Sequence, residues 1–245
     1  MFISFEGIDG CGKSTQARLL ADALRAEGHE VVLTREPGGS PGAEEIRRLL
    51  VEGAGERWSA ETECLLFTAA RRDHLERTIR PALDAGKTVI TDRFADSTRV
   101  YQGAARGDLR EIVDQLHNLM IGIEPTRTFV IDVPLSDAAK RLLQRASSAF
   151  AAAASAAAAA AASAESVAEA AELAAFAAGH AAESARYAEM AKVELEDRFE
   201  SLGAQFQKLL QSGFRALADE NPERITLIDG SGGEGDVAAR IRAAL

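Results

Sequence analysis

Residues 5–15 of the chain are Phe5-Glu6-Gly7-Ile8-Asp9-Gly10-Cys11-Gly12-Lys13-Ser14-Thr15, and they predict much of its architecture. Its residues Gly7, Gly12, Lys13 and Ser14 fill the fixed positions of the pattern G-x-x-x-x-G-K-[ST]. The apolar run 1–5 before it predicts a buried strand, and the leucines of 16–26 after it suit one face of a helix. Strand, glycine loop and helix are the context of a phosphate-binding P-loop.

The P-loop predicts its own chemistry. Glycines let the backbone wrap a phosphate without Cβ clashes, and the loop amides point inward at the positive end of a helix dipole. Lys13 adds a charge for the outer phosphates, and the Ser14 hydroxyl is placed to bind Mg²⁺. The expected phosphate-binding residues are therefore Gly7, Ile8, Asp9, Gly10, Cys11, Gly12, Lys13, Ser14 and Thr15. The alternative is a glycine-rich turn with a solvated lysine.

Composition narrows the classes of function. The chain has 245 residues, enough for one α/β domain, and a formal net charge of −10 at pH 7. That charge argues against a nucleic-acid or membrane surface, which would favour clustered Lys and Arg, but not against a small anionic substrate. The two distant cysteines, Cys11 and Cys64, indicate reduced thiols and a cytoplasmic protein. We expect no signal peptide or membrane span, and the scattered histidines predict no structural metal.

Strands and helices alternate along the chain. Further strands are predicted at 30–34, 87–91, 127–133 and 224–228, and helices at 44–51, 62–85 with an interruption near Pro81, 95–102, 109–121, 136–145 and 236–245. The alternation predicts a single α/β domain over 1–245 with a doubly wound, five-stranded, mostly parallel sheet. Asp9, Arg35, Asp92 and Arg93 fall at or just beyond strand ends, which indicates a two-substrate site.

The composition changes abruptly over 149–190, where alanine dominates. Alanine is the best helix former. We therefore expect an inserted helical hairpin, with the first helix continuing from Arg145 and the second starting near Ser166. One interpretation is a partner-binding arm, and the other is a tolerated low-complexity insertion in a loop.

Phosphoryl transfer brings two anionic groups together and needs cations to neutralise them. Arg93 is suited to a bidentate grip on an acceptor phosphate; the alternative is a surface salt bridge. Asp92 would hold Mg²⁺ or its waters; the alternative is a helix N-cap. Phe67 and Arg71 lie one helical turn apart and face the same way, although Phe67 could equally be a core residue.

Five segments together resemble the bacterial thymidylate kinases. They are the P-loop, Thr34-Arg35-Glu36-Pro37-Gly38-Gly39, Phe67-Thr68-Ala69-Ala70-Arg71, Asp92-Arg93-Phe94 with Ser97, and Tyr101-Gln102-Gly103. The resemblance covers nearly the whole chain except the Ala-rich block. It implies a P-loop nucleoside monophosphate kinase that uses Mg²⁺ and transfers the γ-phosphoryl group of ATP to dTMP. It also implies a homodimer.

The resemblance assigns roles residue by residue. The nine P-loop residues bind ATP, and Ser14 and Asp92 serve the metal. Phe67 stacks on thymine, and Arg71 hydrogen-bonds the base. The set expected to bind the acceptor is Asp9 against the 3′-hydroxyl, Tyr101 crowding C2′, Thr98 and Gln102 at the base edge, and Arg35, Pro37 and Arg93.

One departure concerns Gly10, where some members of the resembled family carry an arginine that assists transfer. A mobile lid should supply that charge here, and the matching segments are 140–145 and 196–200. Arg141 and Arg145 lie one turn apart and can face the same phosphates. They join Lys13 and Arg93 as the expected catalytic residues; the alternative is a solvated helix face. The Ala-rich block separates the two halves of this lid.

Three other functions stay open. Another nucleotide or nucleoside kinase of the same fold would carry a similar P-loop. A GTP-binding switch is disfavoured, because the sequence has no Asn-Lys-x-Asp segment to bind guanine. The split lid also leaves open a catalytically impaired scaffold.

Overall fold

A computed structural model describes residues 1–51, 57–105, 108–163 and 203–245. The chain forms two compact units. The first comprises Met1–Pro134 and Gln207–Leu245, and the second comprises Leu135–Phe206. The sheet and the P-loop belong to the first unit, which is described next.

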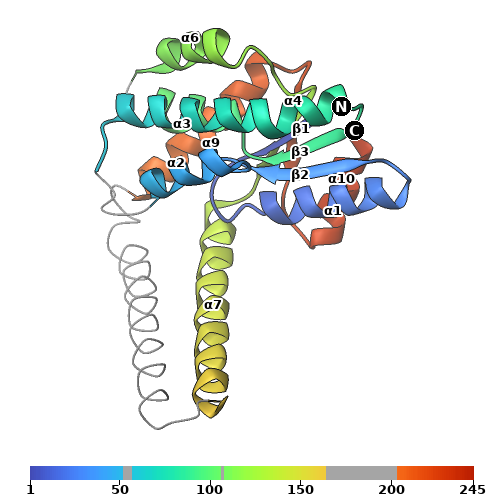
Figure 1. Cartoon of the computed structure of the whole chain (residues 1–245), viewed down its shortest axis with the longest axis vertical. Coiled ribbons are helices and arrows are strands. Elements are labelled where there is room, and N and C mark those ends of the chain that lie inside the picture. Colours follow the sequence, from blue (N-terminus) through green and yellow to red (C-terminus); the bar gives the residue numbers. More distant parts are fainter. Residues whose placement is uncertain (52–56, 106–107, 164–202) are drawn as a thin grey trace. The chain divides into compact units, whose positions relative to one another are not determined.

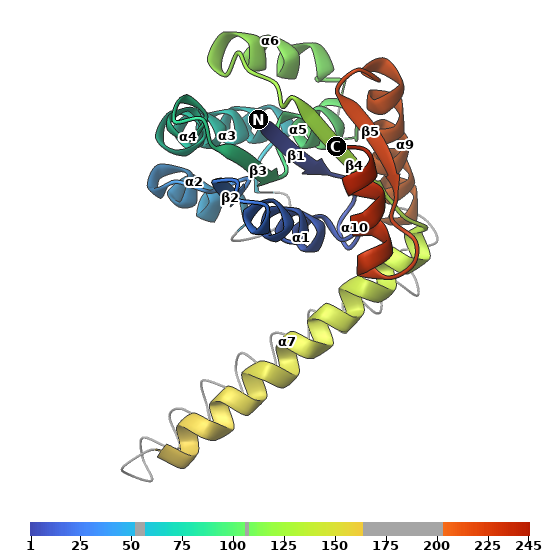
Figure 2. The same cartoon turned by 90° about the vertical axis from the view of Figure 1, so that its right-hand side faces the viewer.

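Five parallel strands form one sheet in the order β2-β3-β1-β4-β5 (Figure 1 and Figure 2). Their bounds are Phe2–Glu6 for β1, Val31–Arg35 for β2, Thr88–Asp92 for β3, Arg127–Asp132 for β4 and Ile225–Asp229 for β5. The predicted five-stranded parallel sheet is confirmed. The chain crosses from one side of β1 to the other between β3 and β4, so the ends of β1, β3 and β4 flank the topological switch point where ligands bind in such sheets.

Helices cover both faces of the sheet (Figure 2). α1 (Lys13–Ala26) and α10 (Glu234–Ala243) lie on one face. The opposite face carries α3 (Ala60–His74), a π-helical turn η1 (Leu75–Ile79), α4 (Arg80–Asp84) and α5 (Ala95–Val100). The remaining elements of this unit are α2 (Pro41–Val51), the π-helical turn η2 (Tyr101–Ala105), α6 (Arg110–Met120) and most of α9 (Gly203–Glu220).

The core between the sheet and the helices that cover this second face is apolar. Phe2 and Val89 of the strands pack with Leu75, Ile79 and Phe94 from the helical side, all of them buried. The rings of Phe2 and Phe94 meet edge to face, with centroids 5.0 Å apart. This packing fixes the turn between β3 and α5, which carries much of the site.

The predicted helix over 62–85 is three elements. α3 ends at His74, the backbone widens into the π turn η1, and α4 begins at Arg80 with Pro81 in its first turn. Proline has no N–H and clashes with the preceding turn of a regular helix, so the interruption predicted near Pro81 is confirmed. The structure adds α9, which the sequence analysis did not predict.

The second unit contains α7, which runs from Leu135 to Ser163 as one helix. It therefore continues from Arg145 into the Ala-rich block, as predicted. The second helix expected from Ser166 lies outside the described residues, as does most of 149–190.

Within the described ranges, none of the helices has the length and apolar character needed to cross a membrane. Across the same ranges, no three His, Cys, Asp or Glu side chains come together as a metal-binding cluster.

Candidate active site

The P-loop connects the end of β1 to the start of α1. Gly7 has a φ of 129°, and a Cβ added to it would lie 2.7 Å from the carbonyl oxygen of Ile131 on β4. The loop therefore passes too close to the neighbouring strand for any side chain at this position. This contact seats the loop at the ends of β1 and β4.

Lys13 reaches back across the loop. Its Nζ donates to the carbonyl oxygens of Gly7 at 3.1 Å and Ile8 at 2.8 Å, and it lies 3.9 Å from Oδ1 of Asp9. The side chain is buried. The lysine charge is thus held inside the loop, at the N-terminus of α1, where an anion is favoured.

Ser14 and Asp92, the two residues expected to serve the metal, lie in contact although they are far apart in the sequence. The Ser14 hydroxyl donates to Oδ2 of Asp92. The other carboxylate oxygen, Oδ1, is buried and has no hydrogen-bond partner among the residues that the structure describes. An unsatisfied carboxylate oxygen beside a hydroxyl is a donor set that suits Mg²⁺ or its waters. The alternative of a helix cap is wrong, because Phe94 occupies the N-cap position of α5.

Arg93 lies in the turn after β3 with a φ of 74°. Its backbone N–H donates to Phe5, and its carbonyl accepts from Thr91. Its Nη1 donates to the Gly7 carbonyl at 3.2 Å and to Oγ of Ser97 at 2.9 Å. Only 17% of the side chain is exposed, so Arg93 is not the surface residue of the alternative interpretation.

Asp9 and Tyr101 complete the surroundings of the Arg93 guanidinium. Nη2 of Arg93 donates to Oδ1 of Asp9 at 2.5 Å and to the Tyr101 hydroxyl at 3.4 Å, and the guanidinium stacks over the Tyr101 ring. Although burial raises the pKa of Asp9, Arg93 and Lys13 more than offset it and lower that pKa. Burial raises the pKa of Tyr101 to about 12 against the opposing effect of Arg93. The pKa of Arg93 also rises, because Tyr101 and Asp9 outweigh its own burial.

A second buried cluster surrounds Arg71 on α3. Its Nε donates to Oε2 of Glu36 at 2.7 Å, and its Nη2 donates to Oγ1 of Thr98 at 3.0 Å. The other oxygen of Glu36 lies 3.0 Å from Nδ1 of His74, whose Nε2 lies 2.8 Å from Oγ1 of Thr34. Arg71, Glu36 and His74 are all buried. The guanidinium is therefore held rigidly between the end of β2 and α5.

The remaining predicted acceptor residues lie around these two clusters. Phe67 is half-buried one turn before Arg71 and is not part of the buried core. Gln102 is buried and donates to Glu63 at 3.0 Å. The Pro37 carbonyl accepts from Arg47. Arg35 is exposed and pairs with Glu44 at 3.0 Å.

Arg141 and Arg145 lie one turn apart on α7, as predicted, but in the second unit. Their part in the site stays a prediction.

Three residues in contact with the predicted site had no role in the sequence analysis. Glu6 and Ser97 hold the turn that carries Arg93, and Glu36 holds Arg71. Each of them belongs to a segment that carries the resemblance, so the signal was there. Their positions in the sequence do not reveal that these side chains point inward.

Known proteins resemble this chain in sequence and in fold. A family model described as thymidylate kinase matches residues 5–182. The thymidylate kinase of Dinoroseobacter shibae is 55% identical over 243 residues, covering 99% of this chain and 95% of the relative. That of Ruegeria pomeroyi is 51% identical over 241 residues, covering 98% and 92%. The crystal structure of thymidylate kinase from Ehrlichia chaffeensis superposes with a TM-score of 0.65 at 30% identity, covering 100% of this chain and 97% of that one. The chain therefore belongs to the thymidylate kinase family.

Proposed function

We propose that this chain transfers the γ-phosphoryl group of ATP to dTMP and releases ADP and dTDP. One observation carries the proposal beyond family membership. Lys13 and Arg93 both donate to the Gly7 carbonyl, at 3.1 and 3.2 Å, and both flank Asp9. The cation of a donor-phosphate loop and the cation suited to an acceptor phosphate therefore meet at one point, as direct transfer between two phosphates requires.

On the donor side, the P-loop amides and Lys13 bind the phosphates of ATP. The residues of this group are Gly7, Ile8, Asp9, Gly10, Cys11, Gly12, Lys13, Ser14 and Thr15. Ser14 and Asp92 would hold Mg²⁺ or its water ligands, and the unsatisfied Oδ1 of Asp92 supports that assignment. The ion would neutralise charge on the transferred phosphoryl group.

On the acceptor side, Arg93 binds the dTMP phosphate, and Asp9 and Tyr101 lie against the sugar. Arg71 hydrogen-bonds the base, and its burial between Glu36 and Thr98 supports a fixed orientation for that contact. The proposed base-binding set is completed by Phe67, Thr98, Gln102, Pro37 and Arg35.

The reaction needs positioning more than acid–base chemistry. A phosphate oxygen of dTMP forms a bond to the γ-phosphorus as the bond to the bridging oxygen of ADP breaks, without a covalent enzyme intermediate. Arg141 and Arg145 would add positive charge to the ATP phosphates on lid closure. The chain supplies a cation on each side of the transferred group and, through Asp9, a carboxylate that stays ionised between them.

Two substitutions separate the sides of the site. Lys13→Ala should lower kcat at least ~100-fold, since it removes charge where negative charge crowds. Arg93→Ala should raise KM for dTMP at least ~10-fold and leave KM for ATP nearly unchanged. The surface variants Lys87→Ala and Arg25→Ala are matched controls, because both side chains lie in exposed ion pairs. A folded Lys13→Ala protein with normal turnover would overturn the assignment of the loop.

We also infer that the chain is a cytoplasmic homodimer. Large apolar side chains stand exposed on two adjacent helices, namely Leu65 of α3 and Ile112, Leu119 and Met120 of α6. Exposed apolar side chains on two helices that contact each other support an association surface. The two cysteines, Cys11 and Cys64, are buried thiols, which suits a reducing compartment.

A further inference from the structure

Glu6 places a carboxylate in the interior at the end of the central strand. Its side chain is fully buried, and it directly precedes Gly7. Oε1 accepts the backbone N–H of Phe94 at 2.7 Å, and Oε2 accepts the Ser97 hydroxyl at 2.5 Å. A buried carboxylate is costly, and an apolar residue would be the ordinary choice at the end of a central strand. Its partners indicate why a carboxylate is there.

Both partners of Glu6 hold Arg93. Phe94 is the next residue in the chain, so its amide fixes the backbone just after the left-handed turn at Arg93. Ser97 accepts from Nη1 of Arg93 at 2.9 Å while it donates to Glu6. A hydroxyl has one hydrogen, so donating it to Glu6 leaves the oxygen lone pairs facing the guanidinium.

We propose that Glu6 is a positioning residue for the acceptor phosphate, and that its ionised carboxylate orients Arg93 through the Phe94 amide and the Ser97 hydroxyl. This inference rests on the proposed binding of the dTMP phosphate by Arg93. A protonated Glu6 would turn its own hydrogen toward Ser97 and reverse the polarity of that bond, so the guanidinium would lose an acceptor of fixed direction.

The charges around Glu6 set its protonation. Burial raises the pKa of Glu6 to about 7, and the charge of Asp96 adds to the rise, while Ser97, Arg93 and the Phe94 amide oppose it. Asp9 contacts the guanidinium of Arg93, and Asp92 is the last residue of the neighbouring strand β3. The site is therefore expected to lose its preferred arrangement as the pH falls below about 7.

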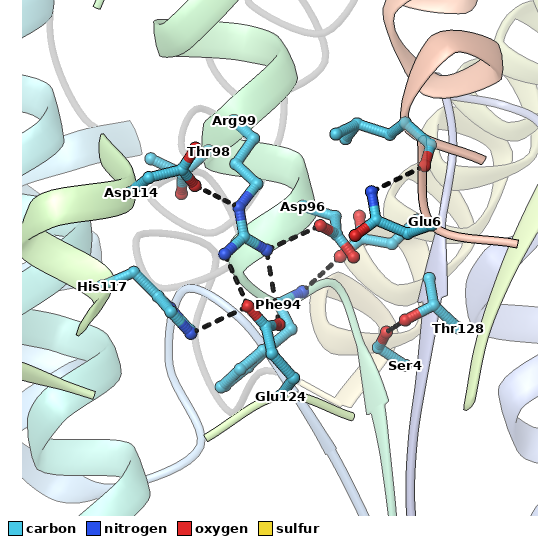
Figure 3. A network of polar contacts seen from close by, with 12 residues as sticks. Ser4, Glu6, Phe94, Asp96, Thr98, Arg99, Asp114, His117, Glu124 and Thr128 are labelled. Carbon is cyan, nitrogen blue, oxygen red and sulfur yellow. Dashed lines mark hydrogen bonds and ion pairs between the residues drawn. The ribbon is translucent and has the colours of Figure 1, made fainter. Parts of the chain in front are cut away.

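Asp96 is held in place by a larger network (Figure 3). Arg99 donates to Asp96 at 2.8 Å and also binds Asp114 and Glu124. Arg224 binds the other side of Asp96 at 2.6 Å. The charge that acts on Glu6 is thus fixed by residues of α5, α6 and the segments before β4 and β5.

The test is a set of steady-state kinetics from pH 6 to 9 with ATP and dTMP. Glu6→Gln and Ser97→Ala should each raise KM for dTMP about tenfold at pH 8, while KM for ATP stays nearly unchanged. The double variant should be no worse than the more affected single variant, because both act on one path. Ser4→Ala is the matched control, since it removes a buried hydroxyl on the same strand that bonds to Thr128 and not to Arg93.

The dependence of kcat/KM on pH tests the proposal, because a purely structural role of Glu6 would not change it. The wild type should show a rise in kcat/KM for dTMP near pH 7 that Glu6→Gln lacks. Ionisation of the dTMP phosphate affects all variants equally, so the comparison removes it. A profile of Glu6→Gln that matches the wild type, or equal losses for ATP and dTMP, would overturn the inference.

Arg93→Ala separates this inference from the proposed function. If Arg93→Ala leaves KM for dTMP unchanged, the proposed role of Arg93 fails. If Arg93→Ala raises that KM and neither Glu6→Gln nor Ser97→Ala does, the inference alone fails. Thermal unfolding checks each variant, and if Glu6→Gln does not fold, the KM split of Ser97→Ala decides the outcome.

Discussion

At the scale of single residues, Glu6 couples function to stability. Its pKa is raised by burial from 4.5 to about 7, so the folded protein binds this proton more tightly than the unfolded chain does. The corresponding stabilisation is complete below pH 4.5 and is lost as the pH rises through 7. The difference amounts to about 3 kcal/mol. An ionised Glu6 that orients Arg93 therefore costs stability.

This sign gives a measurable prediction. The free energy of unfolding in urea should fall between pH 5 and pH 8 in the wild type by more than in Glu6→Gln, because glutamine has no proton to lose. Glu124 acts in the opposite direction and outside this window. Despite burial, His117 and Arg99 lower its pKa to about 2, so its contribution is lost only as the pH falls below 4.5. Parallel curves for the two proteins would contradict a raised pKa at Glu6.

Residue identities were predictable from the sequence where a motif fixed the geometry. Lys13, Ser14, Asp92 and Arg93 lie where the P-loop and the strand ends placed them. Glu6 was missed, because a carboxylate at a strand end is usually solvent-facing, and only the packing of α5 buries this one. Interior ion pairs depend on three-dimensional neighbours that spacing in the sequence does not reveal.

At the scale of elements, alanine substitutions at two glycines distinguish the cost of backbone strain from the cost of a steric clash. Gly7 and Gly28 both have positive φ, at 129° and 91°, but a Cβ on Gly28 would meet nothing within 4 Å. Gly28→Ala should cost about 1–2 kcal/mol of unfolding free energy from strain alone. Gly7→Ala should cost roughly 1–3 kcal/mol more, because its Cβ would press on Ile131, and it should also lower turnover. Equal costs in denaturant unfolding would show that the loop is not seated against β4.

The strands were predicted more completely than the helices and turns. All five strands were found, since buried runs between glycine and polar segments are clear signals, although each boundary except the start of β4 moved by one residue. α9 was missed, although Leu210, Phe214 and Leu217 recur at helical spacing and are buried. The π turn η1 could not be predicted, because it depends on how Leu75 and Ile79 pack into the core.

The Ala-rich block gives a prediction about the lid. Most residues of 149–190 are alanine or serine, which offer no side chain that clamps a phosphate, and the expected lid residues Arg141 and Arg145 lie before the block. Replacing 149–190 by a short Gly-Ser linker should therefore leave dTMP kinase activity equal or higher. Arg145→Ala in that shortened chain should lose most of the activity, since an arginine in this role is worth up to several orders of magnitude. Turnover with saturating ATP and dTMP measures both. Loss of activity in a folded shortened chain would instead make the block part of the enzyme.

At the scale of the whole molecule, the exposed apolar side chains predict self-association. In sedimentation velocity at micromolar concentration, the wild type should sediment with twice the mass of the chain. Leu119→Glu should shift it toward the monomer, because Leu119 is 76% exposed and a charge there would be buried in the dimer. Leu209→Glu, which places a charge at an exposed leucine of α9, is the control and should not cause this shift. A monomeric wild type would contradict the homodimer.

The whole chain is acidic, with a formal charge of −10, yet its site is locally basic. Lys13, Arg71 and Arg93 are each buried or largely buried there, with their charges directed to a few carboxylates and carbonyls. Such fixed cations bind small anions without making the surface attractive to nucleic acid. Overall charge therefore describes the surface of this protein and not its substrate.

We propose that the whole molecule serves one reaction, the transfer of a phosphoryl group from ATP to dTMP. The direct measurement is coupled ADP release by the purified chain with Mg²⁺ and ATP, comparing dTMP with dUMP, UMP, CMP and thymidine. We predict the highest kcat/KM for dTMP and a strong preference over UMP, because Tyr101 closes the sugar side, and Tyr101→Ala should narrow that gap. A higher kcat/KM for UMP or thymidine, or ADP release that no acceptor increases, would contradict this function.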